Sequence, residues 1–237
     1  MFNHYDLITT ILFELFAALS GSLYLRHIKQ EKLRVFVYYL WLTVVAETLG
    51  LYPFILQHNF DYEWFIALKN SPFCSNIWLY NIYAFLAIGF IGVFYSDLLN
   101  NKLYALIIKF TFIVYCLFAF LYFILSDAFF IRGLPYKSII ETMLIVFWII
   151  LYLIDLMKSK ELLRFYKFPT FYISITLLFW YIIVTPLFIF DEYFKAVNAE
   201  FVRFRNTLLF IINLLTYSCF TFGFLYSLYK RKQFKKN

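Results

Sequence analysis

The sequence has few charged residues, few glycines and few prolines. Asp, Glu, Lys and Arg make up only 15% of its 237 residues, against about a quarter in soluble domains. With 6 glycines and 5 prolines, it has no flexible linker that would divide it into domains. Because 64% of the residues are hydrophobic and 25% are aromatic, a soluble fold of this size could not bury them. These properties exclude a soluble protein and predict a polytopic membrane protein.

Cysteine and histidine are also scarce. The 3 cysteines are too few and too scattered for a disulfide framework. The 3 histidines fall in loops or at the ends of apolar stretches, where they cannot form a zinc site inside a bundle. The chain lacks a nucleophile elbow and a phosphate-binding glycine loop, and residues 206–229 contain no lysine that could hold retinal. We therefore predict no catalytic residue, no metal site and no cofactor.

Seven apolar stretches are long enough to cross a bilayer, which takes about 20 helical residues. Only short connections join them, so we expect a single transmembrane domain over residues 1–237. The predicted fold class is all-α, a bundle of seven transmembrane helices. The predicted spans are 7–26, 34–56, 77–99, 103–126, 138–157, 169–190 and 206–229.

The basic residues indicate the orientation of the bundle. The clusters "RHIKQEKLR", "KSKELLRFYK" and "KRKQFKKN" fall on one side of it, while most acids outside the spans fall on the other. The positive-inside rule then places the N-terminus outside and the C-terminus in the cytoplasm. The start "MFNHYD" lacks positive charge, so we expect a retained first span, although "AALSGS" would also suit signal-peptide cleavage. Topology explains the net charge of +7, and we predict no nucleic-acid partner.

Polar residues inside the spans are concentrated at one depth. An ionisable residue deep in a span costs roughly 2.5–3.5 kcal/mol, so it usually faces the bundle interior. Odd-numbered helices run inward and place their early residues near the outer face, whereas the second and sixth helices place their late residues there. Six helices thus contribute polar groups to the outer half: Glu14, Glu47 with Thr43 one turn away, Asn81, Glu141, Thr185, and Asn213 with Tyr217 one turn away.

This polar set has two interpretations. In the first, the groups form a cavity that opens to the outer side, is biased towards negative charge and binds a cation, a proton or an amine. In the second, each group hydrogen-bonds a neighbouring helix, which stabilises the bundle by roughly 0.6–2 kcal/mol. Near the expected mouth, Arg132, Arg203 and Arg205 are placed to neutralise some of the acids.

Other residue types have structural interpretations. We expect Pro186 to kink or end the sixth helix. The small residues Ala84, Ala87, Gly89 and Gly92 predict close packing of the third helix. Tyrosines and tryptophans near span ends are typical of interfacial belts; they are Trp64, Trp78, Tyr80, Tyr104, Tyr193 and Tyr229.

Three short stretches, "AETLGLY" (46–52), "NIWLYNIYAFLAIGF" (76–90) and "NLLTYSCFTFGFLYS" (213–227), carry a family resemblance. The chain resembles uncharacterised small seven-span integral membrane proteins of Bacteroidetes-type bacteria. The resemblance implies a multi-pass protein of the bacterial inner membrane, with Glu47, Asn81, Tyr83 and Asn213 as characteristic polar positions. With this addition, the candidate ligand-binding residues are Glu14, Glu47, Asn81, Tyr83, Glu141, Thr185, Asn213 and Tyr217.

Three functions are compatible with these patterns. The first is a receptor-like or sensory protein in the lipid bilayer, which binds a small cationic or amine ligand and signals to a cytoplasmic partner through basic segments that also suit anionic lipid. The second is a proton- or cation-coupled transporter, and the third is a structural subunit of a membrane complex. A polar path from Glu47 to Asp155 would favour transport, whereas a pocket closed towards the cytoplasm would favour sensing.

Overall fold

The structure is a computed structural model that describes residues 4–56, 62–126, 128–131, 137–159, 168–194 and 199–234. Arg132, the basic stretch 160–167 and the final residues 235–237 lie outside the described residues, as does the side chain of Tyr193. All regular secondary structure in the described ranges is helical. The long helices are α1 (His4–His27), α2 (Glu31–Leu49), α5 (Ile77–Leu98), α6 (Lys102–Leu125), α8 (Lys137–Lys158), α9 (Pro169–Phe194) and α10 (Ala199–Phe234).

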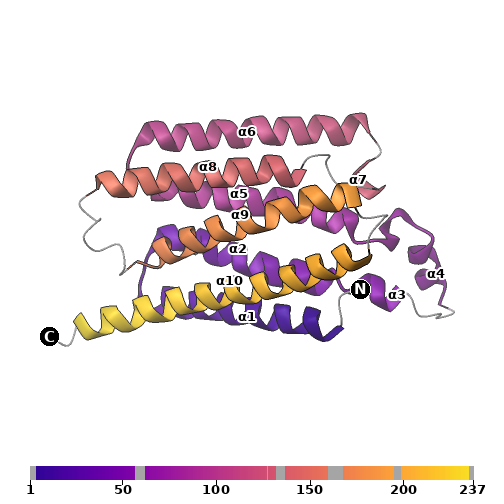
Figure 1. Cartoon of the computed structure of the whole chain (residues 1–237), viewed down its shortest axis with the longest axis horizontal. Coiled ribbons are helices and arrows are strands. Elements are labelled where there is room, and N and C mark those ends of the chain that lie inside the picture. The colour runs from indigo at the N-terminus through magenta and orange to yellow at the C-terminus, as the bar shows by residue number, and fades with distance from the viewer. Residues whose placement is uncertain are drawn as a thin grey trace.

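Seven helical segments in the described chain are long and apolar enough to cross a membrane. The predicted all-α bundle of seven spans is therefore confirmed, and the chain is a multi-pass membrane protein. The N- and C-termini lie at opposite ends of the bundle (Figure 1), as an odd number of spans requires. Short elements lie at the end where α1 begins: α3 (Tyr52–Leu56), α4 (Glu63–Lys69), the 3-10 helix η1 (Pro72–Cys74) and α7 (Ala128–Ile131).

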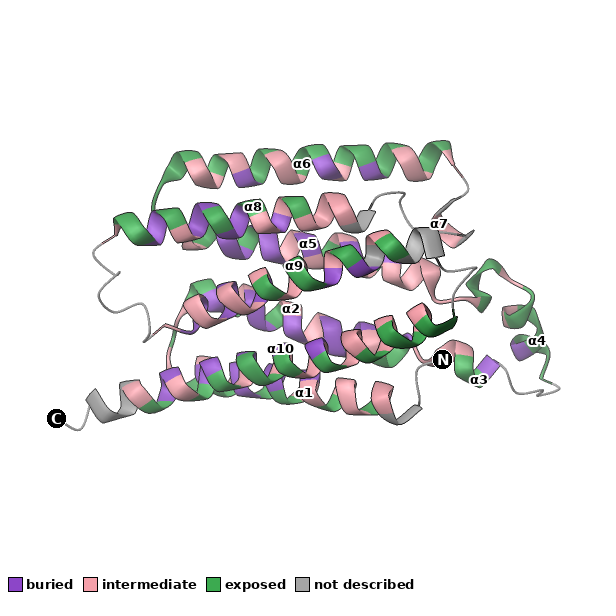
Figure 2. Ribbon diagram, in the orientation of Figure 1, coloured by how far each residue is buried: buried purple, intermediate pink, exposed green. Residues whose placement is uncertain are grey.

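Six of the long helices form a closed ring. Following the contacts around it, α1 packs on α2, α2 on α5, α5 on α8, α8 on α9, α9 on α10, and α10 again on α1. The remaining helix, α6, packs on the outside of this ring against α5 and α8, and it forms one edge of the molecule in Figure 1. It buries only Ile108, Tyr115 and Ala119, which share one face, and it is exposed along its length in Figure 2.

We call the half of the ring in which α1, α5, α8 and α10 end the packed half. Its interior is filled by fully buried rings, among them Phe36, Phe94 and Phe224. Phe36 meets Phe220 edge-on, with ring centroids 5.2 Å apart. A Cβ on Gly92 would lie 3.2 Å from the Trp148 ring, so glycine there permits the close approach of α5 and α8. We call the other half, in which these four helices begin, the cavity half.

Two of the spans have additional detail. The second span extends over Glu31–Leu56, and within it α2 ends at Leu49 and the chain turns at Gly50 and Leu51 before α3. The helix that contains the seventh span begins at Ala199, and its 36 residues span about 54 Å at 1.5 Å per residue. That length exceeds the roughly 30 Å hydrocarbon core, so its ends extend beyond it.

Of the two outcomes predicted for Pro186, a kink or an end of the sixth helix, the structure excludes the second. Pro186 lies inside α9, and the helix continues to Phe194. Proline is tolerated in membrane helices because neighbouring groups can satisfy the backbone carbonyl that it leaves without a donor. Among the small residues of α5, Gly92 packs closely against Trp148 as predicted. Ala84 and Ala87 instead line the cavity of the candidate site.

Candidate functional site

A cavity of about 520 Å³ lies inside the cavity half of the ring. Its volume falls within the roughly 300–1,000 Å³ typical of small-molecule sites. All six ring helices contribute to its walls, whereas no described residue of α6 does. Seven of the eight candidate residues lie together around this space: Glu14, Glu47, Tyr83, Glu141, Thr185, Asn213 and Tyr217.

Asn81 is the exception, and the structure corrects its assignment. Its side chain is buried but is not part of the cavity wall. The Asn81 Nδ2 donates a hydrogen bond of 2.9 Å to the backbone carbonyl of Phe129 in α7. Topology predicted the depth of Asn81 but could not predict the direction in which it points. The residue therefore fastens α7 to α5.

Glu47 is held by a donor from α5. The hydroxyl of Tyr80 donates to Glu47 Oε2 at 3.0 Å, so Tyr80 belongs to the cavity and not to the predicted interfacial belt. Gly50 makes this contact possible, because a Cβ at that position would lie 2.6 Å from the Tyr80 hydroxyl oxygen. A side chain at position 50 would therefore displace Tyr80 from the position in which it bonds to Glu47.

The stretches "AETLGLY" and "NIWLYNIYAFLAIGF" pack against each other around this contact. Asn76 Nδ2 donates to the carbonyl of Gly50 at 2.9 Å. Trp78 Nε1 donates to the Tyr52 hydroxyl at 2.9 Å, and Tyr52 in turn donates to the Ser75 carbonyl. These bonds fix the end of α2 against the start of α5, and they hold the Glu47 carboxylate at the cavity wall.

Tyr83 is joined to α2 one turn below Glu47. Thr43 Oγ1 donates to the Tyr39 carbonyl at 3.0 Å, and the Tyr83 hydroxyl lies 3.1 Å from the same Oγ1. The two hydroxyls of this second bond come from α2 and α5 and join these helices. Thr43 and Tyr39 also line the cavity. The spacing of Thr43 and Glu47 indicated this face of α2, whereas nothing in the sequence indicated Tyr39.

Glu141 is connected to the helix outside the ring. The hydroxyl of Tyr115, in α6, donates to Glu141 Oε1 at 2.5 Å. A second bond, from Trp148 Nε1 to Thr111 Oγ1 at 3.0 Å, joins α8 to α6 four residues before Tyr115. The same face of α6 that packs on the ring therefore contacts one of the cavity carboxylates.

Further bonds join the remaining walls. Trp180 Nε1 donates to Asn213 Oδ1 at 2.9 Å, which links α9 to α10. The Thr185 hydroxyl lies 2.8 Å from Thr142 Oγ1, which links α9 to α8. The two interpretations of the polar set are thus not alternatives, because groups that hydrogen-bond neighbouring helices also border the cavity.

Glu14 differs from the other cavity carboxylates. Its side chain is only 3% exposed, whereas Glu47 and Glu141 are half-buried. Its Oε2 is buried and has no hydrogen-bond partner, which is rare for a buried polar atom. Tyr39 and Tyr217 are among its neighbours. The cavity therefore contains one carboxylate oxygen that the protein itself does not satisfy.

The cavity is closed towards the packed half. Its floor includes Ile88, Ile145 and Phe220. Beyond the floor, the fully buried rings of Phe36, Phe94 and Phe224 fill the interior of the six-helix ring. Asp155 lines a separate pocket of about 210 Å³ at the far end, where its Oδ2 accepts from the Asn100 backbone N–H at 2.8 Å. An apolar aromatic layer thus separates the two sites.

Arg203 and Arg205, the two described arginines of those predicted near the mouth, do not line the cavity. Arg203 is exposed, and Arg205 donates to Asn206 Oδ1 at 3.0 Å. Within the described part of the chain, no three His, Cys, Asp or Glu side chains converge closely enough to hold a metal ion. The three carboxylates consequently act as separate polar groups on different walls.

Comparisons with protein-family models, with curated proteins and with solved structures give no match to this chain.

Proposed function

We propose that this chain is a receptor-like or sensory membrane protein whose cavity binds a small cationic or amine ligand from the outer side and whose ring transmits the occupancy to a cytoplasmic partner. The observation that carries the proposal is the cavity of about 520 Å³, which all six ring helices share and which three carboxylates border. A ligand there contacts every helix of the ring at once. A ligand that binds one packing arrangement of the helices more tightly than another shifts the equilibrium towards the first.

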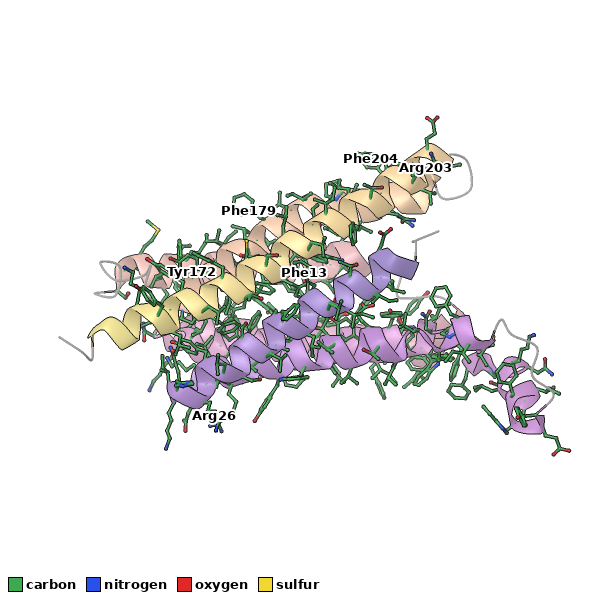
Figure 3. The ribbon with its side chains drawn as sticks, turned by 90° about the horizontal axis from the view of Figure 1, so that it is seen from below. Phe13, Arg26, Tyr172, Phe179, Arg203 and Phe204 are labelled. Atoms are coloured by element: carbon green, nitrogen blue, oxygen red, sulfur yellow. The ribbon has the colours of Figure 1, made fainter. Side chains whose placement is uncertain are left out.

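The charges support an orientation with the N-terminus outside and the C-terminus in the cytoplasm of a bacterial inner membrane. Arg26, Lys32 and Lys158 lie at the ends of helices in the packed half. Figure 3 shows Arg26 at the end of the bundle opposite Arg203. Under the positive-inside rule, the packed half faces the cytoplasm and the cavity half faces outward. The same basic ends suit contact with anionic lipid as well as with a protein partner.

Transport is the second candidate, because three carboxylates border a cavity within the membrane. The buried aromatic layer of Phe36, Phe94 and Phe224 between Glu47 and Asp155 favours sensing over transport. A structural subunit of a membrane complex would have no use for a cavity of this size.

The proposal is tested by thermal stability of the full chain in detergent, with inorganic cations, amines and lipids added singly. We expect at least one to raise the melting temperature of the wild type and of Glu63→Gln, an exposed carboxylate in α4 outside the cavity. Glu47→Gln is expected to weaken the shift. If no addition stabilises the wild type, the binding function is wrong.

The orientation has its own test. A reporter that is active only outside the cytoplasm, fused after Asn237, should stay inactive. An active reporter would overturn the orientation without bearing on the cavity.

A further inference from the structure

We infer that the ligand of the cavity is an organic monocation, an amine with a single positive charge on an apolar body, and that Glu14 Oε2 is its anchor. The inference rests on the proposed function, because it requires that the cavity binds a ligand. It adds the chemical class of that ligand and the residue that selects it.

The second carboxylate oxygen singles out Glu14. Each of the three carboxylates has a tyrosine partner: Tyr80 for Glu47, Tyr115 for Glu141 and Tyr217 for Glu14. Among these three described residues, only Glu14 also has an oxygen, Oε2, that is buried without a hydrogen-bond partner. A buried acceptor without a donor is unfavourable, and a buried charge is unfavourable unless it is paired. An ammonium group satisfies both requirements, because it carries N–H donors and a positive charge.

The walls around Glu14 suit a cation with an apolar substituent. Tyr39 and Tyr217 are neighbours of Glu14, and Tyr83 also lines the cavity. Faces of aromatic rings attract ammonium groups, most strongly where water is excluded. Deeper in the cavity the lining becomes apolar, with Ile145 and Leu177. This gradient places the charged end at Glu14 and the apolar body towards the floor.

Size and geometry exclude a bare metal ion as the preferred ligand. A single ion or water occupies a small fraction of about 520 Å³, since a water takes about 30 Å³ in the liquid. Calcium requires six to eight oxygen ligands at about 2.3–2.6 Å, and the described carboxylates do not converge in that way. An organic molecule is large enough to fill the cavity. Its single ammonium group pairs with the one buried carboxylate oxygen of the cavity that has no partner, Glu14 Oε2.

The test measures thermal stabilisation of the full chain in detergent by a panel of probes. The monoamines are phenylethylamine, tryptamine and hexylamine; 2-phenylethanol is the neutral analogue, spermidine the polycation, and sodium and calcium the inorganic cations. We expect a monoamine to stabilise the wild type at a concentration at least tenfold below that of 2-phenylethanol. Spermidine, sodium and calcium should not outperform it.

Variants assign the anchor. Glu14→Gln should raise the half-maximal monoamine concentration at least tenfold, whereas Glu47→Gln and Glu141→Gln should raise it less than threefold. Glu14→Asp keeps the charge and should keep part of the response, which provides the measurement if Glu14→Gln does not fold. A response of Glu14→Gln within twofold of wild type, or of Glu14→Asp no better than Glu14→Gln, overturns the anchor.

The failures are distinguishable. If 2-phenylethanol, spermidine or an inorganic cation stabilises better than every monoamine, the inferred ligand class is wrong and the binding function stands. If neither this panel nor the lipids stabilise the wild type, the binding function itself fails.

Discussion

In the packed half, the rings of Phe36, Phe94 and Phe224 pack together inside the six-helix ring, whereas in the cavity half tyrosines and carboxylates line an open space. The same six helices build both halves. Tyrosines occur in each, but those of the packed half bond to uncharged groups, as Tyr95 does to Ser174 Oγ at 3.1 Å. In the cavity half, Tyr83 also bonds to an uncharged group, Thr43, but Tyr80 holds the Glu47 carboxylate at the wall.

The difference shows how a membrane bundle can keep a cavity without losing its shape. In the packed half, dispersion between close-packed rings holds the helices together. In the cavity half, hydrogen bonds run between neighbouring helices around the rim, such as Trp180 to Asn213 and Thr185 to Thr142. Close packing and the cavity therefore lie at different positions along the length of the helices, and substitutions in the two halves should have different consequences.

The largest expected difference is in access to water. In a variant in which the 3 native cysteines are replaced, Thr185→Cys should react with a membrane-impermeant thiol reagent added from outside, because Thr185 lines the cavity. Ser174→Cys, on the same helix but fully buried in the packed half, should not react. Labelling is measured by the mass increase. Equal labelling of both positions would refute the division into two halves.

The next largest effect is on stability. Trp148→Ala removes a fully buried ring from the packed half and should lower the free energy of unfolding by about 3–5 kcal/mol. The matched change in the cavity half, Trp180→Ala, removes a half-buried ring and one hydrogen bond, so its effect should be clearly smaller. Denaturant titration in detergent measures both. The reverse order would show that the cavity half is the stabilising core.

Added volume should also distinguish the halves. Gly92→Leu forces atoms against Trp148, whose ring lies 3.2 Å from the position of a Cβ, and should cost about 1–3 kcal/mol. Ala87→Leu, on the same helix, projects into the cavity and should change stability little while weakening ligand stabilisation. Melting temperatures with and without a monoamine test both effects. Comparable losses of stability would contradict an open cavity at Ala87.

The smallest expected effect concerns α6. Tyr115→Phe removes the donor to Glu141 Oε1 and should lower stability by about 1–2 kcal/mol. Tyr95→Phe removes the bond to Ser174 and should cost about 0.6 kcal/mol, the average for membrane hydrogen bonds. Thermal unfolding of the two variants gives the comparison. A larger loss for Tyr95→Phe would show that the Glu141 contact is not the stronger one.

Sequence reasoning predicted the depth of the polar residues well, because depth depends only on the span in which a residue lies and on how far along it. Glu14, Glu47 and Glu141 consequently fall around one cavity, as the topology suggested. Their neighbours could not be predicted in this way. Tyr80 was assigned to an interfacial belt from its place near a helix end, yet its hydroxyl reaches Glu47 because Gly50 has no side chain.

The sequence also did not predict the direction in which each polar side chain points. Asn81 has the same depth as the cavity residues, but its amide faces α7. The position of α6 outside the ring was likewise not predictable, since its composition resembles that of the other spans and its neighbours α5 and α8 follow from packing.

The sequence by itself determined that this chain is an all-helical, multi-pass membrane protein with seven spans and with its intramembrane polar groups at one depth. Hydrophobic length and charge distribution act locally along the chain, so they can be evaluated without a fold. Only the tertiary structure decided that the helices close a ring of six, that seven polar candidates border one cavity, and that Glu14 alone among the cavity carboxylates retains a buried oxygen without a donor. These properties depend on contacts between residues far apart in sequence, which arise when the helices pack.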